Sequence, residues 1–209
     1  MGYYPVYLDM TGRVTVVVGG GTVAERKVKG LLEAGAAVTV ISPYLTATLA
    51  RWVKKRLVEH IARNYAPGDL AGYELAFIAT DDQRVNAAVS QESKRRGVWV
   101  NAADDPANCD FILPSVLRRG ELTIAVSTGG KSPALSRAVR EELENYFGND
   151  YSVLSKIVAD VRKELRQRSV APSSEAWRNA LNRELQSLVH RGELRHARTY
   201  LLRQLGANA

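Results

Sequence analysis

The sequence predicts an α/β protein whose core is a doubly wound parallel sheet of the Rossmann type. Short runs such as 14–18 (VTVVV) are β-branched at every position, which is typical of strands buried on both faces. Helical patterns alternate with these runs along the first half of the chain. A glycine cluster, Gly19-Gly20-Gly21, directly follows the first run. Because crossovers between parallel strands are right-handed, these three observations together indicate this architecture.

Five strands and three helices are predicted before residue 113, with a helix after the first, second and fourth strands. Gly35 and Gly97 directly follow two of the helices, at the position where glycine commonly ends a helix. The predicted strands are 14–18, 38–41, 59–64, 75–80 and 98–101, and the predicted helices are 23–34, 45–57 and 82–96.

The pattern changes after Pro114. Residues 115–117 and 122–127 flank a short turn that contains Gly120, which predicts an antiparallel hairpin. Ser132-Pro133 then supplies an N-cap and a first-turn proline for a helix that reaches Phe147.

Beyond this helix, apolar residues recur at helical spacing almost to the end of the chain, with a connector at 169–174. We therefore predict a Rossmann domain at 1–113, a dimerisation region at 114–150 and a C-terminal helical domain at 151–209. The hairpin and its following helix extend beyond the Rossmann core, so they are expected to form a homodimer interface, with packing inside one chain as the alternative.

Composition limits the classes of protein that remain. The chain has 209 residues, 45% apolar and 24% charged, and it contains no apolar run of the roughly 18–20 residues that cross a bilayer. The first 13 residues lack the basic start of a signal peptide, and the one cysteine, Cys109, excludes an internal disulfide. We expect a cytoplasmic protein with no membrane partner and no zinc cluster, whose three histidines face solvent.

The positive charge lies in the second half of the chain. Residues 1–115 contain 13 basic and 12 acidic side chains, whereas residues 116–209 contain 16 and 10. Such a surface favours a polyanionic partner. Nucleic acid is one alternative, but basic and acidic residues alternate along the helices and no binding motif is present, so we expect none.

The glycine cluster fits the dinucleotide-binding pattern G-x-G-x-x-A through Gly19, Gly21 and Ala24. The first glycine permits a tight turn, the second lets a pyrophosphate approach the backbone, and the alanine allows the helix to pack closely on the strand. The second strand ends in Ser42-Pro43-Tyr44, without the usual carboxylate for the ribose and without an arginine for a 2′-phosphate. These residues favour NAD over NADP as the cofactor, with Ser42 as a hydrogen-bonding partner of the ribose.

Two further clusters carry candidate chemistry. Ser127, Thr128, Lys131 and Ser132 lie at a predicted helix start, where hydroxyl and amide groups favour substrate carboxylates. A P-loop is excluded there because position 125 is alanine. Asp104 follows the last predicted strand of the sheet, at the edge where ligands bind, so it is a candidate proton acceptor.

The sequence resembles the precorrin-2 dehydrogenase family, the NAD-dependent module of siroheme synthase. The resemblance rests on VVVGGGTVAERKVKGLLEAGAAVTVISP, AFIATDD, VNAADDPANCDFILPS and LTIAVSTGGKSPALSRAVREELE, in this order over about residues 3–150. It implies a homodimeric enzyme that oxidises precorrin-2 to sirohydrochlorin with NAD, and some relatives also insert ferrous iron.

The resemblance also implies roles for particular residues. Catalysis falls on Asp104. The hydroxyl before the Gly-Gly pair, which is a serine in some relatives, is that of Thr128 here. The implied NAD contacts are Gly19, Gly21, Thr22, Val23, Ser42, Pro43, Tyr44, Ala79 and Thr80. A regulatory domain that binds NAD without catalysis is the alternative; such domains usually keep an acidic residue where Ser42 stands.

Overall fold

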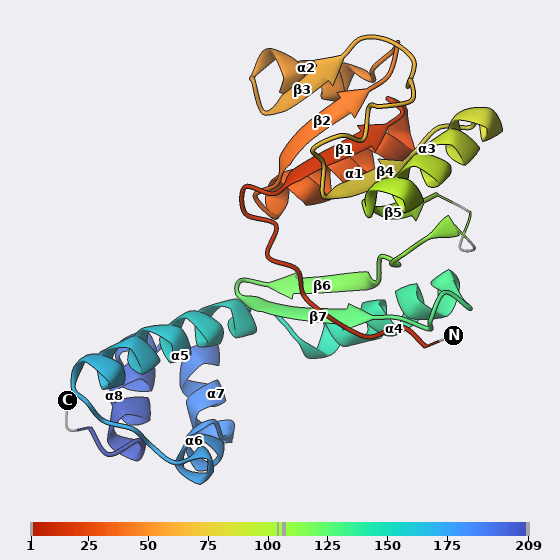
Figure 1. Cartoon of the computed structure of the whole chain (residues 1–209). Coiled ribbons are helices and arrows are strands. Elements are labelled where there is room, and N and C mark those ends of the chain that lie inside the picture. Colours follow the sequence, from red (N-terminus) through yellow and green to blue (C-terminus); the bar gives the residue numbers. More distant parts are fainter. Residues whose placement is uncertain (1, 104, 106–107, 208–209) are drawn as a thin grey trace. The chain divides into compact units, whose positions relative to one another are not determined.

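The computed structural model describes residues 2–103, 105 and 108–207, and the chain divides into two units, Met1–Leu113 and Pro114–Ala209 (Figure 1). The first unit is an α/β sheet with covering helices. Its elements are β1 (Val14–Val18), α1 (Thr22–Glu33), β2 (Ala37–Ile41), α2 (Ala47–Lys54), β3 (Val58–Ile61), β4 (Leu75–Ile78), α3 (Gln83–Arg96) and β5 (Trp99–Ala102).

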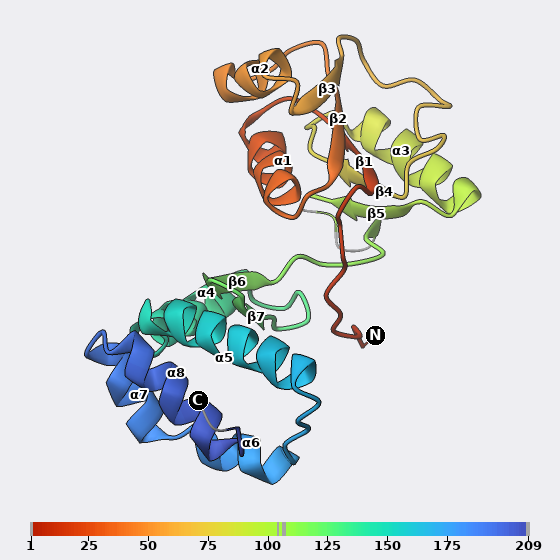
Figure 2. The same ribbon diagram turned by 90° about the vertical axis from the view of Figure 1, so that its left-hand side faces the viewer.

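The five strands form one parallel sheet in the order β3-β2-β1-β4-β5. This order confirms the predicted doubly wound architecture, since the chain starts in the middle strand and winds outward in both directions. Figure 2 shows α1 and α2 on one side of the sheet and α3 on the other.

Both faces of the central strand are buried, as its continuous β-branched run predicts. Val17 packs with Val28 and Leu49 under α1 and α2, whereas Val16 packs with Val89 under α3. All five side chains are fully shielded from solvent. The two faces therefore form separate apolar layers, and both layers hold the carboxyl ends of the strands in place.

Some predicted boundaries shift by a few residues. The third strand ends at Ile61 instead of residue 64, and the second helix is limited to Ala47–Lys54. Thr46 is the N-cap at which this helix begins, and its hydroxyl oxygen accepts a hydrogen bond from the Leu49 amide at 3.2 Å.

No helix joins β3 to β4 in the described residues; a loop does, and Glu92 of α3 holds it. The Glu92 carboxylate is 2% exposed and accepts hydrogen bonds from the amides of Gly68 (2.8 Å) and Leu70 (3.2 Å), as well as from the Tyr65 hydroxyl. Arg96 completes the set through its Nε at 2.6 Å. Burial raises the pKa of Glu92, but these hydrogen bonds outweigh it and leave the pKa below its ordinary value.

The second unit begins with the predicted hairpin. β6 (Ser115–Arg119) and β7 (Leu122–Val126) pair antiparallel, and Gly120 takes the positive φ of +59° that the turn requires. α4 (Pro133–Tyr146) packs against both strands and is capped by Ser132, whose Oγ accepts from the Leu135 amide at 3.2 Å.

Four helices complete this unit: α5 (Asp150–Gln167), α6 (Ser174–Ala180), α7 (Arg183–His190) and α8 (Leu194–Gln204). Their narrow apolar stripes cover one another, with Val161, Leu185 and Leu201 fully buried in a shared core. The cover that the sequence pattern requires for α5–α8 is therefore supplied inside one chain. None of the helices in the part of the chain that the structure describes has both the length and the apolar character to cross a membrane.

Candidate functional site

The glycine cluster brings together the loops that follow β1, β2 and β4. A Cβ atom on Gly19 would lie 2.1 Å from the carbonyl oxygen of Ala79, and one on Gly20 would lie 1.9 Å from that of Tyr44. Gly19 also has a φ of +117°, a backbone conformation that side-chain-bearing residues rarely adopt. Glycine at these two positions is therefore a requirement of the fold itself.

Gly21 differs from Gly19 and Gly20. Its φ of −83° is open to any residue, and a Cβ atom there would meet nothing within 4 Å. The protein's own packing thus leaves room for a side chain at Gly21. An unfilled space beside the first turn of a helix is what a pyrophosphate needs in order to reach the backbone.

The amino end of α1, next to Gly21, has the features of an anion-binding site. Gly21 is the N-cap of α1 and supplies no side-chain cap, so no side chain of the cap residue covers the amides of the first turn. Those N–H groups carry the positive end of the helix dipole. Thr22 is exposed and Val23 half-buried at this end, while Ala24 is fully buried against the sheet, as the motif predicts.

The turn after β2 presents its aromatic residue to solvent. Tyr44 is 83% exposed, whereas Ser42 is buried and its Oγ accepts from the Tyr44 amide at 3.4 Å. The carbonyl oxygen of Ser42 lies 2.8 Å from Nε2 of His60 on β3. The expectation that all histidines face solvent is therefore wrong for His60, because strand pairing brings it beside β2. A ribose contact by Ser42 stays a prediction.

At the end of β4, Ala79 and Thr80 are half-buried beside the glycine loop. The Ala79 amide donates to the Val18 carbonyl at 2.8 Å, which extends the β1–β4 pairing to the carboxyl edge. The Thr80 carbonyl accepts from Asn86 Nδ2 at 3.2 Å, and its hydroxyl oxygen accepts from the Asp82 amide at 3.2 Å. The predicted contacts in the first unit thus lie on three adjacent strand ends, β2, β1 and β4.

Another group at this edge has no signal in the sequence. The hydroxyl of Thr46 donates to Oε2 of Glu25 at 2.5 Å, and the Thr46 amide donates to the carbonyl of Gly20 at 3.0 Å. These bonds tie the start of α2 to the glycine loop and to the first turn of α1.

The end of β5 contains the buried amide of Asn101. Its Oδ1 accepts from Nζ of Lys27 on α1 at 2.7 Å, and its Nδ2 donates to the carbonyl of Phe111 at 3.0 Å. Cys109 lies in the same cluster, and burial raises the pKa of its thiol, in keeping with a packing role.

Acidic residues follow β5, and the sequence predicts a catalytic role for one of them. Asp105 Oδ2 accepts from Asn108 Nδ2 at 2.8 Å, which is a turn contact. Asp104, the predicted catalytic residue, lies outside the described residues.

The predicted substrate loop belongs to the second unit. Thr128 Oγ1 donates to the Ser132 carbonyl at 3.0 Å and accepts from the Ser132 amide at 2.8 Å, while Ser127 Oγ accepts from the Gly129 amide at 3.1 Å. Gly129 has a positive φ of +64°. These hydroxyls shape the loop, and Lys131 is left exposed on it.

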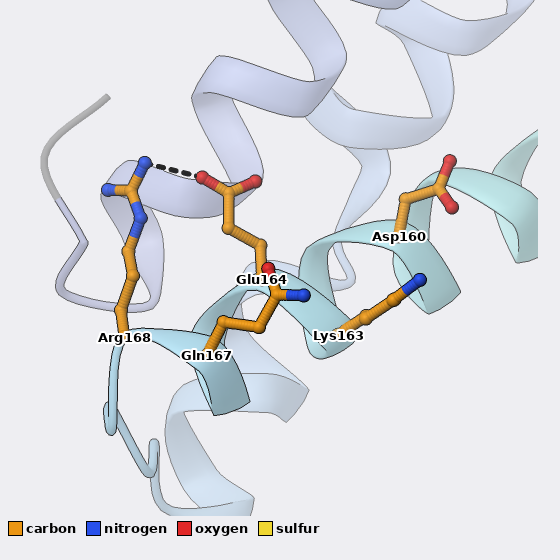
Figure 3. A pocket seen from close by; sticks show the side chains of 5 residues that line it. All are labelled: Asp160, Lys163, Glu164, Gln167 and Arg168. Carbon is orange, nitrogen blue, oxygen red and sulfur yellow. Dashed lines mark ion pairs between the residues drawn. The ribbon is translucent and has the colours of Figure 1, made fainter.

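A surface pocket coincides with neither the glycine loop of the first unit nor the predicted substrate loop of the second. It lies along α5 and is lined by charged and amide side chains, among which Arg168 pairs with Glu164 at 2.5 Å (Figure 3). In the described part of the chain, no three His, Cys, Asp or Glu side chains gather in a way that could hold a metal ion.

The parallel sheet, the open position at Gly21 and the uncapped helix define a protein of the NAD(P)-binding Rossmann class. Comparison with known proteins agrees: residues 6–115 match an NAD(P)-binding family, and residues 119–146 match the central family of sirohaem biosynthesis proteins. The chain belongs to the family of siroheme synthases and SirC-type precorrin-2 dehydrogenases.

Individual relatives support this membership. Siroheme synthase of Methylobacillus flagellatus is 37% identical over 95% of this chain, and that of Methylococcus capsulatus is 36% identical over 100%. The solved structure of SirC, precorrin-2 dehydrogenase, superposes with a TM-score of 0.75 at 28% identity, covering 97% of this chain and 98% of that one. The chain spans under half the length of these two siroheme synthases, 46% and 44%.

Proposed function

We propose that this chain oxidises precorrin-2 to sirohydrochlorin with NAD, as a step of siroheme biosynthesis. The observation that carries the proposal is the open, unstrained Gly21 at the start of α1, in a chain whose family includes a precorrin-2 dehydrogenase. The residues fit a dinucleotide, because glycine at this position has no packing reason and leaves the approach to the helix amides clear.

Several residues would hold the cofactor. The α1 amides at Thr22 and Val23 would bind the pyrophosphate, the turn at Ser42-Pro43-Tyr44 would contact the adenosine, and Ala79 with Thr80 would border the nicotinamide side. When bound, the nicotinamide supplies a hydride acceptor.

The charges near β2 favour NAD over NADP. A 2′-phosphate needs an arginine or lysine, and the turn after β2 offers serine, proline and tyrosine. Arg63, which follows the neighbouring strand β3, is bound by Asp69 through two contacts of 2.6 and 2.7 Å. This bidentate pairing occupies the guanidinium.

The oxidation removes two hydrogens from precorrin-2, one as a hydride and one as a proton. Asp104 is proposed to accept the proton, because it follows β5 in the sequence and the carboxyl ends of the strands border the ligand crevice in this fold. The products are then sirohydrochlorin, the reduced cofactor and a protonated carboxyl group that releases its proton to water.

The loop of Ser127, Thr128, Gly129, Lys131 and Ser132 is proposed to bind the carboxylates of the tetrapyrrole. Because the Thr128 hydroxyl is already engaged with Ser132, the Lys131 ammonium and the backbone amides are the groups that would meet the substrate. The excess of basic residues after position 115 would attract the same polyanion.

A homodimer is proposed on β6 and α4. Apolar side chains that a monomer would be expected to cover lie exposed on this region, namely Val116 at 38%, Leu135 at 54% and Tyr146 at 71%. Pairing through a two-fold axis would bury each of them in a self-complementary contact.

One anaerobic assay tests the enzyme assignment. The wild-type chain is incubated with precorrin-2 and either NAD or NADP, and the formation of reduced nicotinamide and of sirohydrochlorin is followed by absorbance. Faster turnover with NAD is expected. A second arm adds ferrous or cobaltous ion to test for metal insertion. Binding of NAD without turnover would instead indicate a regulatory domain.

A further inference from the structure

We propose that Lys27 is a positioning residue that links the cofactor-binding helix to the segment carrying the catalytic candidate. This inference rests on the proposed dehydrogenase function. Thr22 is the first residue of α1 and Lys27 is the sixth, so Lys27 lies in the second turn of the helix. Its side chain reaches a strand residue 74 positions further along the chain.

Four side chains form a closed cluster on the α1 face of the sheet. Nζ of Lys27 donates to Oδ1 of Asn101 at 2.7 Å and lies 5.4 Å from the ring centroid of Phe77. The Phe77 ring meets the Phe111 ring edge-on, with centroids 5.6 Å apart and planes at 84°. Asn101 Nδ2 closes the cluster by donating to the carbonyl of Phe111 at 3.0 Å.

The cluster holds both ends of one segment. Asn101 lies at its start on β5 and Phe111 at its end, and Asp104 lies between them in sequence. Further bonds draw the two ends together: the Asp110 amide donates to the Val100 carbonyl at 2.9 Å, and the Ala102 amide donates to the Cys109 sulfur at 3.1 Å. Asn101 is therefore tied to both ends of the segment, at β5 and at Phe111.

The Lys27 ammonium orients the Asn101 amide. An amide can turn by 180° and exchange its donor and acceptor ends, but a cation beside Oδ1 permits only the orientation in which Nδ2 faces Phe111. The Phe77 ring adds a cation–π contact to the same ammonium. Because Lys27 belongs to the helix whose first turn would bind the pyrophosphate, it joins Asn101 and Phe111, the two ends of the segment, to that helix.

The test uses Lys27→Met, which keeps the length of the side chain and removes its charge and donors. Lys27→Arg is the conservative variant. Lys29→Met is the matched control, because Lys29 lies on the same helix, is exposed and approaches Glu33 only to 3.9 Å. Each full-length variant is measured for NAD affinity by calorimetry, for kcat and KM, and for amide hydrogen exchange without cofactor.

For Lys27→Met we expect faster exchange at the Ala102 and Asp110 amides, by about tenfold or more, from the loss of a charged hydrogen bond. We expect kcat to fall about 10- to 100-fold from misplacement, with NAD affinity within about twofold of wild type. Lys27→Arg should recover most of both losses, and Lys29→Met should match wild type. Adding Lys27→Met to Asp104→Ala should lower kcat no further.

Unchanged exchange in Lys27→Met would overturn the proposal. Faster exchange with wild-type kcat would also overturn it, since Lys27 would then support the fold alone. If the wild type does not oxidise precorrin-2, the proposed function fails, while the exchange measurement still decides whether Lys27 holds the segment.

Discussion

Gly19 and Gly21 are two residues apart, yet substituting them is expected to have opposite consequences. In Gly19→Ala, the new Cβ would meet the Ala79 carbonyl at 2.1 Å, and the residue would have to adopt a φ of +117°. Backbone strain and overpacking together cost about 2–6 kcal/mol of unfolding free energy. That is a large share of the roughly 5–15 kcal/mol available to a typical domain.

Gly21→Val, in contrast, introduces its side chain into space that no protein atom occupies within 4 Å of the Cβ. Its cost is that of a poorer N-cap, about 1 kcal/mol or less. The same side chain would fill the place of the pyrophosphate and separate it from the helix amides. Losing two hydrogen bonds to a charged group weakens NAD binding by about 100-fold or more.

Urea unfolding and calorimetry separate the two effects. Gly19→Ala should shift the unfolding midpoint strongly, while Gly21→Val should shift it only slightly and lose NAD binding. Gly30→Val is the control, because Gly30 lies on α1 with nothing within 4 Å of its Cβ position and should bind NAD normally. A folded Gly21→Val protein with wild-type NAD affinity would refute the cofactor site.

Three further predictions concern catalysis, assembly and acid stability. Asp104→Ala should lower precorrin-2 oxidation by about 10²-fold or more while NAD binding persists, and Asp105→Ala should have a mild effect; near-normal turnover in a folded Asp104→Ala enzyme would show that another group takes the proton. Sedimentation at micromolar concentration should give a dimer, and Leu135→Glu should give a folded monomer; a monomeric wild type would contradict the proposed interface. Because the folded-state pKa of Glu92 lies below its ordinary value of 4.5, its contribution to stability is present above that value and is lost as pH falls through the folded pKa. The stability difference between wild type and Glu92→Gln should therefore shrink as the pH is lowered in that range, and a constant difference would exclude this role.

The sequence alone was enough to predict the parallel sheet, because its information is local. The run 14–18 is β-branched at every position, and Gly19, Gly21 and Ala24 follow at fixed spacing. Each of these features depends on residues only a few positions apart, so it can be recognised without knowing which residues lie across the sheet. The hairpin around Gly120 was predicted for the same reason, since its turn requires a positive φ.

Only the tertiary structure decided which glycine the fold requires and which residues meet from distant parts of the chain. Gly19, Gly20 and Gly21 are identical letters, and they differ only because Ala79 and Tyr44 lie against the first two. His60 meets Ser42 through strand pairing, Glu92 organises a loop that precedes it by 22 to 24 residues, and Lys27 reaches Asn101 across 74 residues. Such contacts leave no periodic pattern in the sequence, because the spatial arrangement of the strands and helices decides which distant residues meet.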